Sequence, residues 1–303
     1  MDGVTKTATS IMPPRAPLPM APQDFARTPS RQMLEPANTL RNTAWRFAAF
    51  APALLITLVL STAIAMWLAK GGVTALETMV VGLVALTFIW VSLSVTTVSL
   101  GLVRRVINPC RTKLGRDRGS AQSIALLVPI YNEVPWDGFG NASAMLKELH
   151  QGPNKDRYSL FILSDTRDPE IAEHERRAYY ALRADAPDGI DVFYRQRAQN
   201  TDKKVGNLTQ WIENWGAAYD AMVVLDADSL MSGAAIRQLA HELAADPEAG
   251  LIQSFPSLIG ARTLFGRMQQ FSNAVYGWLL AEGLAVWSQS ESNYWGHNAI
   301  IRT

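Results

Sequence analysis

The pattern of hydrophobic and polar residues differs between successive regions of the chain. Two apolar runs, 47–69 and 78–103, contain no Asp, Glu, Lys or Arg, and only residues 70–77 separate them. Each run exceeds the roughly 20 residues that a helix needs to cross a bilayer. A cleavable signal peptide does not fit, because a long polar stretch precedes the first run. We therefore predict a two-helix transmembrane hairpin over residues 45–105.

Basic residues flank this hairpin on both outer sides and set its expected orientation. They are Arg27, Arg31, Arg41 and Arg46 before the first run and Arg104, Arg105, Arg111, Lys113, Arg116 and Arg118 after the second. The positive-inside rule then places both flanks in the cytoplasm and only residues 70–77 on the far side of the membrane. Residues 106–122 are predicted to form a basic linker that faces anionic lipid.

The first 44 residues contain the proline-rich run IMPPRAPLPMAP and few aromatic residues. Such a composition cannot bury enough apolar surface to fold by itself, so we expect a disordered cytoplasmic tail over 1–44. The net charge of +1 argues neither for nor against nucleic acid, and no nucleic-acid partner is predicted. The single cysteine, Cys110, excludes an internal disulfide.

From residue 123 onward, apolar runs of strand length alternate with stretches of helix length. The predicted strands are 123–133, 158–165, 190–197, 221–228 and 250–256, and the predicted helices are 139–150, 169–184, 205–219 and 233–245. This alternation is typical of right-handed crossover units, so we predict an α/β domain with a mainly parallel sheet over residues 123–303. The aromatic and apolar stretch 265–287 is predicted to be an amphipathic helix at the membrane surface.

Polar side chains stand at the carboxyl ends of four of the predicted strands, where such sheets bind ligands. They are Tyr131, Asn132 and Glu133, then Asp165, then Arg195 and Arg197, then Asp226 and Asp228. Lys203 and Lys204 precede the third predicted helix. A solvated helix start would explain these two lysines, but the helix dipole disfavours positive charge at an N-terminus, which favours a functional reason.

Asp226 and Asp228 lie two positions apart at the end of a strand-like apolar run. Asp and Ser are ordinary turn and capping residues, so a purely structural role is one interpretation. Residues two apart on a strand point to the same side, however, and two converging carboxylates need a cation. Mg²⁺ or Mn²⁺ fits, because one or two carboxylates hold such an ion while substrate phosphates and water complete its shell. The pair thus favours a phosphate-bearing substrate.

Four ordered motifs carry a resemblance to a known family. They are VPIYNE (128–133), ILSDTRD (162–168), DKKVGNL (202–208) and LDADS (225–229), and their order and spacing resemble the inverting family 2 glycosyltransferases, which have the GT-A fold. With NYWGHNAIIR (293–302), the detail is similar to the members that make osmoregulated periplasmic glucans from UDP-glucose in the bacterial inner membrane. The resemblance implies a multi-pass membrane glucosyltransferase whose catalytic domain is cytoplasmic.

The resemblance also implies a role for individual residues. Tyr131, Glu133 and Asp165 would hold the uracil and ribose of UDP-glucose, and Lys204 would neutralise the diphosphate. Asp226 and Asp228 would hold the nucleotide and its divalent ion, Mg²⁺ or Mn²⁺. Trp295 and His297 would face the growing glucan acceptor, although a Trp near a membrane can equally be interfacial or part of a core.

One part of the family pattern is missing. An inverting transferase needs a general base for the acceptor hydroxyl, and in the family this is an Asp well downstream of the acceptor segment. We therefore expect the base beyond Thr303 and the domain to be incomplete at its C-terminal side.

Two other functions stay open at this point. A haloacid-dehalogenase-like phosphatase would use Asp226 as nucleophile and Asp228 as acid or base, although such enzymes carry that motif on their first strand. A nonenzymatic membrane scaffold is the other.

Overall fold

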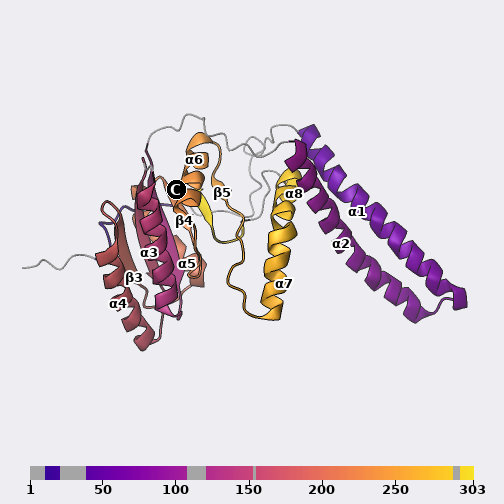
Figure 1. Ribbon diagram of the computed structural model, residues 1–303, viewed down its shortest axis with the longest axis horizontal. Coiled ribbons are helices and arrows are strands. Elements are labelled where there is room, and N and C mark those ends of the chain that lie inside the picture. Colours follow the sequence, from indigo (N-terminus) through magenta and orange to yellow (C-terminus); the bar gives the residue numbers. More distant parts are fainter. Residues whose placement is uncertain (1–10, 21–38, 108–120, 153–154, 289–293) are drawn as a thin grey trace, which may run out of the picture. The chain divides into compact units, whose positions relative to one another are not determined.

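A computed structural model describes residues 11–20, 39–107, 121–152, 155–288 and 294–303. The chain divides into two compact units (Figure 1). The α/β unit comprises Met1–Gln23, Gly115–Ser254 and Tyr294–Thr303, and the helical unit comprises Asp24–Leu114 and Phe255–Asn293. Most of the predicted basic linker, including Cys110, lies outside the described residues.

The α/β unit is built on a six-stranded sheet in the order β3-β2-β1-β4-β6-β5. The strands are β1 (Ser123–Ile130), β2 (Arg157–Ser164), β3 (Asp191–Gln196), β4 (Ala221–Val224), β5 (Leu251–Gln253) and β6 (Ala299–Arg302). Strands β3, β2, β1 and β4 are mutually parallel, whereas β6 runs antiparallel between β4 and β5. The predicted α/β class and mainly parallel sheet are therefore confirmed.

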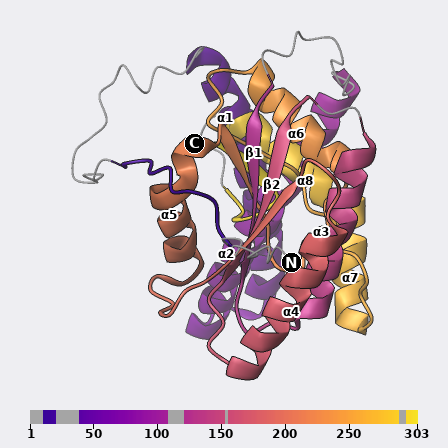
Figure 2. The same cartoon turned by 90° about the vertical axis from the view of Figure 1, so that its left-hand side faces the viewer.

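Helices cover both faces of the sheet, which is why its central strands read as unbroken apolar runs. The helices are α3 (Pro135–Gln151), α4 (Pro169–Asp185), α5 (Lys203–Trp215) and α6 (Gly233–Ala245). Alternate residues of β1 point to opposite faces: Ile124 and Leu126 pack with α3, α4 and α6, whereas Ala125 and Leu127 pack with Trp211 of α5. Figure 2 shows α5 on one side of the sheet and α3, α4 and α6 on the other.

The predicted elements of this unit are confirmed with shifted ends, and one strand was missed. Residues 293–302 were interpreted only as an acceptor-side segment, but Ala299–Arg302 forms β6. This strand pairs with β4, which lies far away in the sequence, and local pattern gives no sign of such a partner. The predicted strand 221–228 ends at Val224, so the two aspartates lie beyond it.

Residues 11–20 correct the expectation of a disordered tail over 1–44. This proline-rich segment lies against the α/β unit, where Ile11 packs on the core shared by α3, α4 and α6. Backbone hydrogen bonds join it to β3 and to the end of α5. Composition alone missed this, because the segment is ordered by surface that other parts of the chain supply.

The helical unit contains the two long apolar helices α1 (Thr39–Leu68) and α2 (Ala75–Ile107). Both are long and apolar enough to cross a membrane, as the predicted spans require, although length and composition alone support this. Thr74, just before α2, and Glu77, in its first turn, form a reciprocal capping box: Thr74 N donates to Glu77 Oε2 at 2.8 Å, and Glu77 N donates to Thr74 Oγ1 at 3.3 Å.

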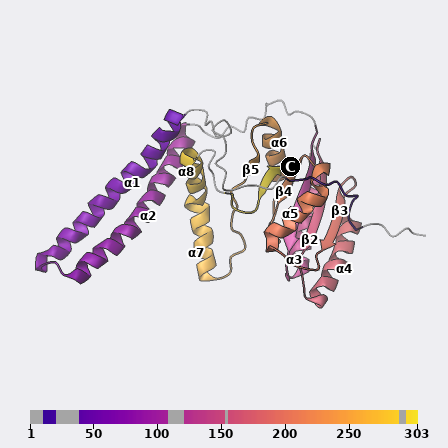
Figure 3. The same cartoon turned by 180° about the vertical axis from the view of Figure 1, so that it is seen from behind.

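The stretch predicted as an amphipathic helix is helical from residue 264 to residue 288. It consists of α7 (Leu264–Ser272), a π-helical segment (Asn273–Gly277) and α8 (Trp278–Ser288). Figures 1 and 3 show α8 beside α2. Gly101 of α2 and Gly283 of α8 allow this approach, because a side chain at either position would overlap the backbone of the other helix. The location of this stretch at a membrane surface stays a prediction.

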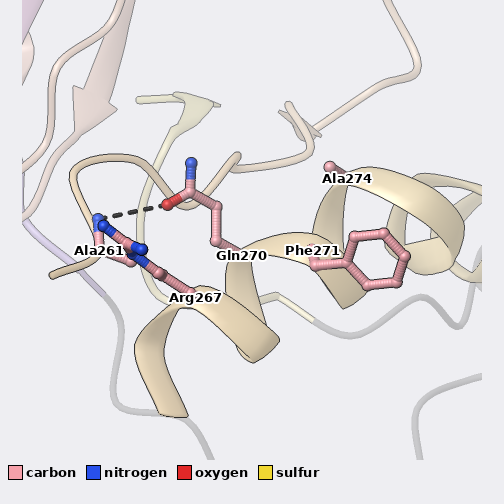
Figure 4. Close-up of a pocket in the computed structure, with 5 residues that line it drawn as sticks. All are labelled: Ala261, Arg267, Gln270, Phe271 and Ala274. Carbon is pink, nitrogen blue, oxygen red and sulfur yellow. Dashed lines mark hydrogen bonds between the residues drawn. The ribbon is translucent and has the colours of Figure 1, made fainter. Parts of the chain in front are cut away.

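A shallow pocket lies on the helical unit beside α7 and is lined by Ala261, Arg267, Gln270, Phe271 and Ala274 (Figure 4). Its main polar contact is internal, since the Ala261 amide donates to Gln270 Oε1 at 3.2 Å. The pocket contains none of the predicted site residues.

Candidate functional site

Asp165 and Arg197 form a buried ion pair beyond the ends of β2 and β3. Arg197 Nε and Nη2 donate to the two carboxylate oxygens of Asp165 at 2.5 and 2.8 Å. The side chains are only 4% exposed for Asp165 and 7% for Arg197. Such a bidentate, charge-assisted contact fixes both the position and the charge of the carboxylate.

Glu175 of α4 is buried beneath the same strand ends and organises them. Ser164 Oγ and Tyr194 OH donate to Glu175 Oε2 at 2.6 and 2.9 Å, and Thr166 Oγ1 donates to Oε1. Thr166 Oγ1 in turn accepts the backbone amide of Asn132 at 2.9 Å. Burial and the Glu175 carboxylate raise the pKa of Tyr194, so this phenol remains a donor. The network therefore links α4 and β3 to the turn after β1.

Sequence reasoning missed Glu175, although one signal could have found it. A charged residue stands at helical spacing on the otherwise apolar stripe of α4, which comprises Ala172, Ala178, Tyr179 and Leu182. Because charged side chains are rarely buried unless hydrogen bonds satisfy them, this position predicts polar partners underneath the helix.

Asn132 turns the chain sharply at the end of β1. Its φ of 51° lies in the left-handed region, which Asn tolerates better than most residues. The side-chain Oδ1 accepts the backbone amides of Arg167 at 3.1 Å and Asp168 at 3.4 Å, which ties this turn to the one after β2. Tyr131 and Glu133, on either side of Asn132, are consequently exposed at the strand edge.

Asp226 and Asp228 lie in a turn after β4 instead of on the strand itself. The Ser229 amide donates to Asp226 O, and the Asp226 amide donates back to Ser229 Oγ, both at 3.0 Å. Strand alternation therefore does not place the two carboxylates, as the sequence argument had assumed. The turn instead half-buries Asp226 and leaves Asp228 exposed.

Lys204, at the start of α5, contacts Asp226 directly. Its Nζ donates to Asp226 Oδ1 and to Gly296 O, the latter at 2.8 Å. The backbone just before is unusual, because Asp202 and Lys203 have φ angles of 55° and 50°. Left-handed conformations cost non-glycine residues energy and gather at functional sites. The start of α5 is thus held in a shape that aims Lys204 at the aspartate turn.

The segment just before β6, which includes Gly296, His297 and Asn298, also contacts the turn that holds Asp226. Gly296 and Asn298 have positive φ angles of 90° and 52°, and Ser229 Oγ donates to Asn298 Oδ1 at 3.0 Å. His297 Nε2 lies 3.9 Å from Asp226 Oδ2. The missed strand β6 is therefore what brings the predicted acceptor-side segment to the predicted metal residues.

Negative charge is concentrated around this turn. Although Glu133 is exposed as a residue, partial desolvation of its carboxyl group raises its pKa, and the nearby carboxylates of Asp228, Asp226 and Glu175 raise it further. Burial, together with the charge of Asp226, also raises the pKa of Tyr294 to about 12. Among the described residues, Lys204 contacts Asp226 directly as a cation, and His297 Nε2 lies farther off, at 3.9 Å. An added cation would relieve the repulsion among the remaining carboxylates.

The donor set fits some metal ions better than others. Within the described residues, no group of three or more His, Cys, Asp and Glu side chains is arranged to hold a metal. A closed zinc-type site is therefore not present in that part of the chain. Asp226 and Asp228 suit a hard ion such as Mg²⁺ or Mn²⁺, which needs only one or two carboxylates when substrate phosphates supply further oxygens.

The predicted site residues thus fall into two groups. Lys204, Asp226 and His297 are in or near contact, and Glu133 and Asp228 share their electrostatic field. Asp165 is joined to Arg197 in a separate buried pair, and Tyr131 is 46% exposed at the end of β1. Trp295 is half-buried, and its backbone amide donates to Gln253 Oε1 at 3.2 Å on β5.

A mainly parallel α/β sheet, an antiparallel strand inserted beside β4, and acidic residues gathered with a lysine at the strand ends define a glycosyltransferase domain of the GT-A type. The family model described as Glycosyl transferase family 2 matches residues 125–303. The chain belongs to this family, as its motifs predict.

The chain is similar over most of its length to larger curated proteins. It is 40% identical over 296 residues to the glucans biosynthesis glucosyltransferase H of Rhodopseudomonas palustris (strain BisA53), covering 96% of this chain and 41% of that one. The protein of that name from Shewanella oneidensis is 39% identical over 297 residues, covering 97% of this chain and 41% of that one. The chain therefore spans about two fifths of the length of these relatives.

Among solved structures, the mannosyltransferase PcManGT from Pyrobaculum calidifontis in complex with GDP-Man and Mn²⁺ aligns with a TM-score of 0.38 and 16% identity. The alignment covers 54% of this chain and 45% of that one, an overlap too weak to support any statement about donor or metal. The family assignment comes from sequence and decides against the phosphatase alternative.

Proposed function

We propose that the chain is the donor-binding part of a membrane glucosyltransferase that transfers glucose from UDP-glucose to a growing glucan with inversion. The observation that carries the proposal is the cluster at the start of α5 and the end of β4, where Lys204 meets Asp226 beside Asp228 and Glu133. Relatives named for glucan biosynthesis support the choice of glucose and glucan.

Lys204 has the position needed to hold a diphosphate. Its ammonium group now bridges Asp226 and the Gly296 carbonyl, and both are surface-accessible partners that a stronger anion can replace. As glucose leaves, negative charge builds on the departing diphosphate, and a lysine aimed there stabilises the transition state. A Mg²⁺ or Mn²⁺ ion held by Asp226 and Asp228 would supply further electrostatic stabilisation of the leaving group.

The nucleoside is proposed to bind along the ends of β1 and β2. The exposed ring of Tyr131 offers a stacking face for uracil, and Glu133 offers acceptors for ribose hydroxyls. Asp165 holds Arg197 with both oxygens, yet a carboxylate has about four lone-pair sites, so it can accept a further hydrogen bond. The Asn132–Thr166–Glu175 network would keep this edge in shape while the nucleoside enters.

Trp295 and His297 are proposed to face the acceptor. They stand on the segment that leads into β6, and His297 lies 3.9 Å from Asp226 and hence beside the proposed diphosphate position. The half-buried Trp295 would offer an apolar surface to a sugar ring.

The membrane arrangement belongs to the same proposal. The protein would be a multi-pass protein of the bacterial inner membrane, with its N-terminus and the α/β unit in the cytoplasm. A cysteine at Gly72, in the loop between α1 and α2, should react with a membrane-impermeant reagent in intact cells, in a background where Cys110 is replaced by Ser. Labelling of a cysteine at Ser120 instead would contradict this orientation.

Calorimetric titration of the purified chain with UDP-glucose, with and without Mg²⁺, tests the proposal. We expect Mg²⁺-dependent binding, and weaker binding of GDP-mannose as a matched control for the base and sugar. Absence of binding by any nucleotide sugar would favour the scaffold alternative. Equal binding of both donors would contradict the assignment of the uracil site.

A further inference from the structure

The segment of residues 11–20, IMPPRAPLPM, lies along the outer edge of β3 and the C-terminal end of α5. Strand β3 is one of the two edge strands of the sheet, and no strand among the described residues pairs with its outer side. The Tyr194 amide on this edge donates to Ile11 O at 3.2 Å. The first residue of the segment therefore occupies the place that a neighbouring strand would take.

Ile11 and Met12 continue this strand-like arrangement with their side chains. Ile11 packs against the core between the sheet and α3, α4 and α6, whereas Met12 packs against the core on the α5 face. Consecutive residues of an extended chain point to opposite sides, so one short stretch can close both cores at the sheet edge. Both contacts bury apolar side chains that the tail alone could not bury.

The next residues contact Trp215, the last residue of α5. Trp215 Nε1 donates to Pro13 O at 3.1 Å. Proline-rich segments adopt an extended conformation without internal hydrogen bonds, so their carbonyl groups remain free for aromatic donors of this kind. Four prolines between residues 13 and 19 also reduce the conformational entropy that docking costs.

Ala16 then satisfies backbone groups at the end of the helix. Its amide donates to Asn214 O at 2.8 Å, and its carbonyl accepts the Ala217 amide at 3.2 Å. The last carbonyl groups of a helix have no partner within the helix, so an outside donor is needed. Ala16 is one of the residues between the prolines that still carries an N–H, which makes its position in the run specific.

Leu18 completes the contact by lying on Gly216. A Cβ atom at position 216 would stand 3.2 Å from Leu18 Cβ and 3.3 Å from Leu18 Cδ2, tighter than ordinary van der Waals contact. The small residue therefore makes room for the leucine.

We propose that residues 11–20 are a docking peptide and that the edge of β3 together with Trp215, Gly216 and Ala217 is a site built to hold it. The occupant is this chain's own proline-rich segment, bound in the manner of an extended peptide ligand. Docking closes the exposed sheet edge against pairing with other strands and ties the tail to the α/β unit. This inference does not depend on which nucleotide sugar or which metal ion the protein binds.

Hydrogen exchange of the purified full chain tests the proposal with two matched variants. Ala16→Pro keeps the extended conformation but removes the N–H that Asn214 O accepts, whereas Ala16→Ser keeps that donor. We expect exchange of the Tyr194 and Ala217 amides to be at least about tenfold faster in Ala16→Pro than in Ala16→Ser, which corresponds to about 1.4 kcal/mol. Exchange of α3, which does not touch the segment through any backbone hydrogen bond, should be the same in both.

Equal exchange at Tyr194 and Ala217 in the two variants would overturn the proposal. Disulfide trapping gives a second measurement in a chain carrying Cys110→Ser, Leu18→Cys and Gly216→Cys. The two Cβ positions are within a few tenths of an ångström of the roughly 3.5–4.5 Å that a disulfide needs. The bond should form at least about tenfold faster with Ala16→Ser than with Ala16→Pro, and equal rates would contradict a docked segment.

Discussion

Asp165 and Asp226 stand at equivalent places, each just beyond a parallel strand of the same sheet, yet their environments differ. Asp165 is 4% exposed and accepts hydrogen bonds from Nε and Nη2 of the buried Arg197 guanidinium. Asp226 has a side chain that is 37% exposed and contacts the ammonium of Lys204, itself 36% exposed. The same residue type in the same position of the fold is therefore enclosed in one case and accessible in the other.

The difference in exposure bears on which carboxylate can exchange its present partner for another. A fixed, neutralised carboxylate such as Asp165 can shape a pocket and accept a hydrogen bond, but it has little freedom to bind a new cation. A carboxylate paired with a mobile lysine can exchange that partner for a metal ion or let the lysine turn to a phosphate. The two aspartates cannot be distinguished by their positions in the motifs, whereas their side-chain exposures of 4% and 37% differ clearly.

The largest effect is expected from Asp165→Asn. Removing one member of a buried pair leaves the Arg197 guanidinium uncompensated and costs about 3–5 kcal/mol of stability. Thermal unfolding of the purified chain should show this loss. The double variant Asp165→Asn with Arg197→Gln should recover much of it, because no unpaired charge then remains buried. A normal unfolding temperature for the single variant would contradict the conclusion that the Asp165–Arg197 pair is enclosed.

Asp228→Asn is expected to change binding while leaving the fold intact. Asp228 is exposed, so its amide replacement creates no buried unpaired group. Mg²⁺-dependent affinity for UDP should fall at least tenfold, or about 1.4 kcal/mol, in a calorimetric titration. Asp188→Asn, at an exposed turn before β3, is the matched control and should bind normally. Unchanged Mg²⁺ dependence would remove Asp228 from the site.

Lys204→Gln tests the same comparison by removing the cation that contacts Asp226. Its pair with Asp226 is more than a third exposed, so solvent screens it and its loss should cost only about 0–1 kcal/mol of stability. UDP affinity should nevertheless fall both with and without Mg²⁺, because the lysine acts on the diphosphate itself. A loss of stability as large as that of Asp165→Asn would show that the pair is structural.

The smallest effect concerns the pH dependence of ion binding. Folding raises the pKa of the Glu133 carboxyl above its ordinary value, so the folded protein binds a proton at Glu133 more tightly than the unfolded chain does. The stability that Glu133 contributes therefore declines as pH rises through the folded pKa. A divalent ion held by Asp226 and Asp228, as proposed, would favour ionised Glu133 and lower its pKa. Ion affinity should therefore weaken as pH falls through the raised pKa of Glu133.

Glu133→Gln removes this titration and should shift the weakening of ion affinity to lower pH. Titration of Mg²⁺-dependent UDP binding at several pH values measures the shift. Identical pH profiles for the unchanged protein and for Glu133→Gln would show that Glu133 does not interact electrostatically with the ion.

Local pattern was sufficient for much of the α/β unit. The apolar runs of β1, β2 and β4 and the helices that follow them could be predicted from periodicity, because a strand buried on both faces is apolar at nearly every position. The aspartate pair, Lys204 and Asp165 could also be found, since each directly follows or precedes such a run. Turn chemistry marked the ends of these elements to within a few residues.

Other features of the site depend on partners that are distant in sequence. Whether Asp165 is enclosed depends on Arg197, and whether Glu175 is satisfied depends on three hydroxyl groups from β2, the turn after it and β3. Periodicity could not identify β6, because a strand of four residues is defined by its pairing with β4 and β5.

The sequence by itself thus determined the α/β class, the two apolar helices and the identity of the residues at the strand ends, because these follow from interactions between near neighbours in the chain. Only the tertiary structure decided which carboxylate is buried, that the Gly296 carbonyl reaches Lys204 and His297 reaches Asp226, and that residues 11–20 are ordered. Each of these depends on surface that folding creates, and a short proline-rich stretch or a single charged residue carries no record of the surface it will meet.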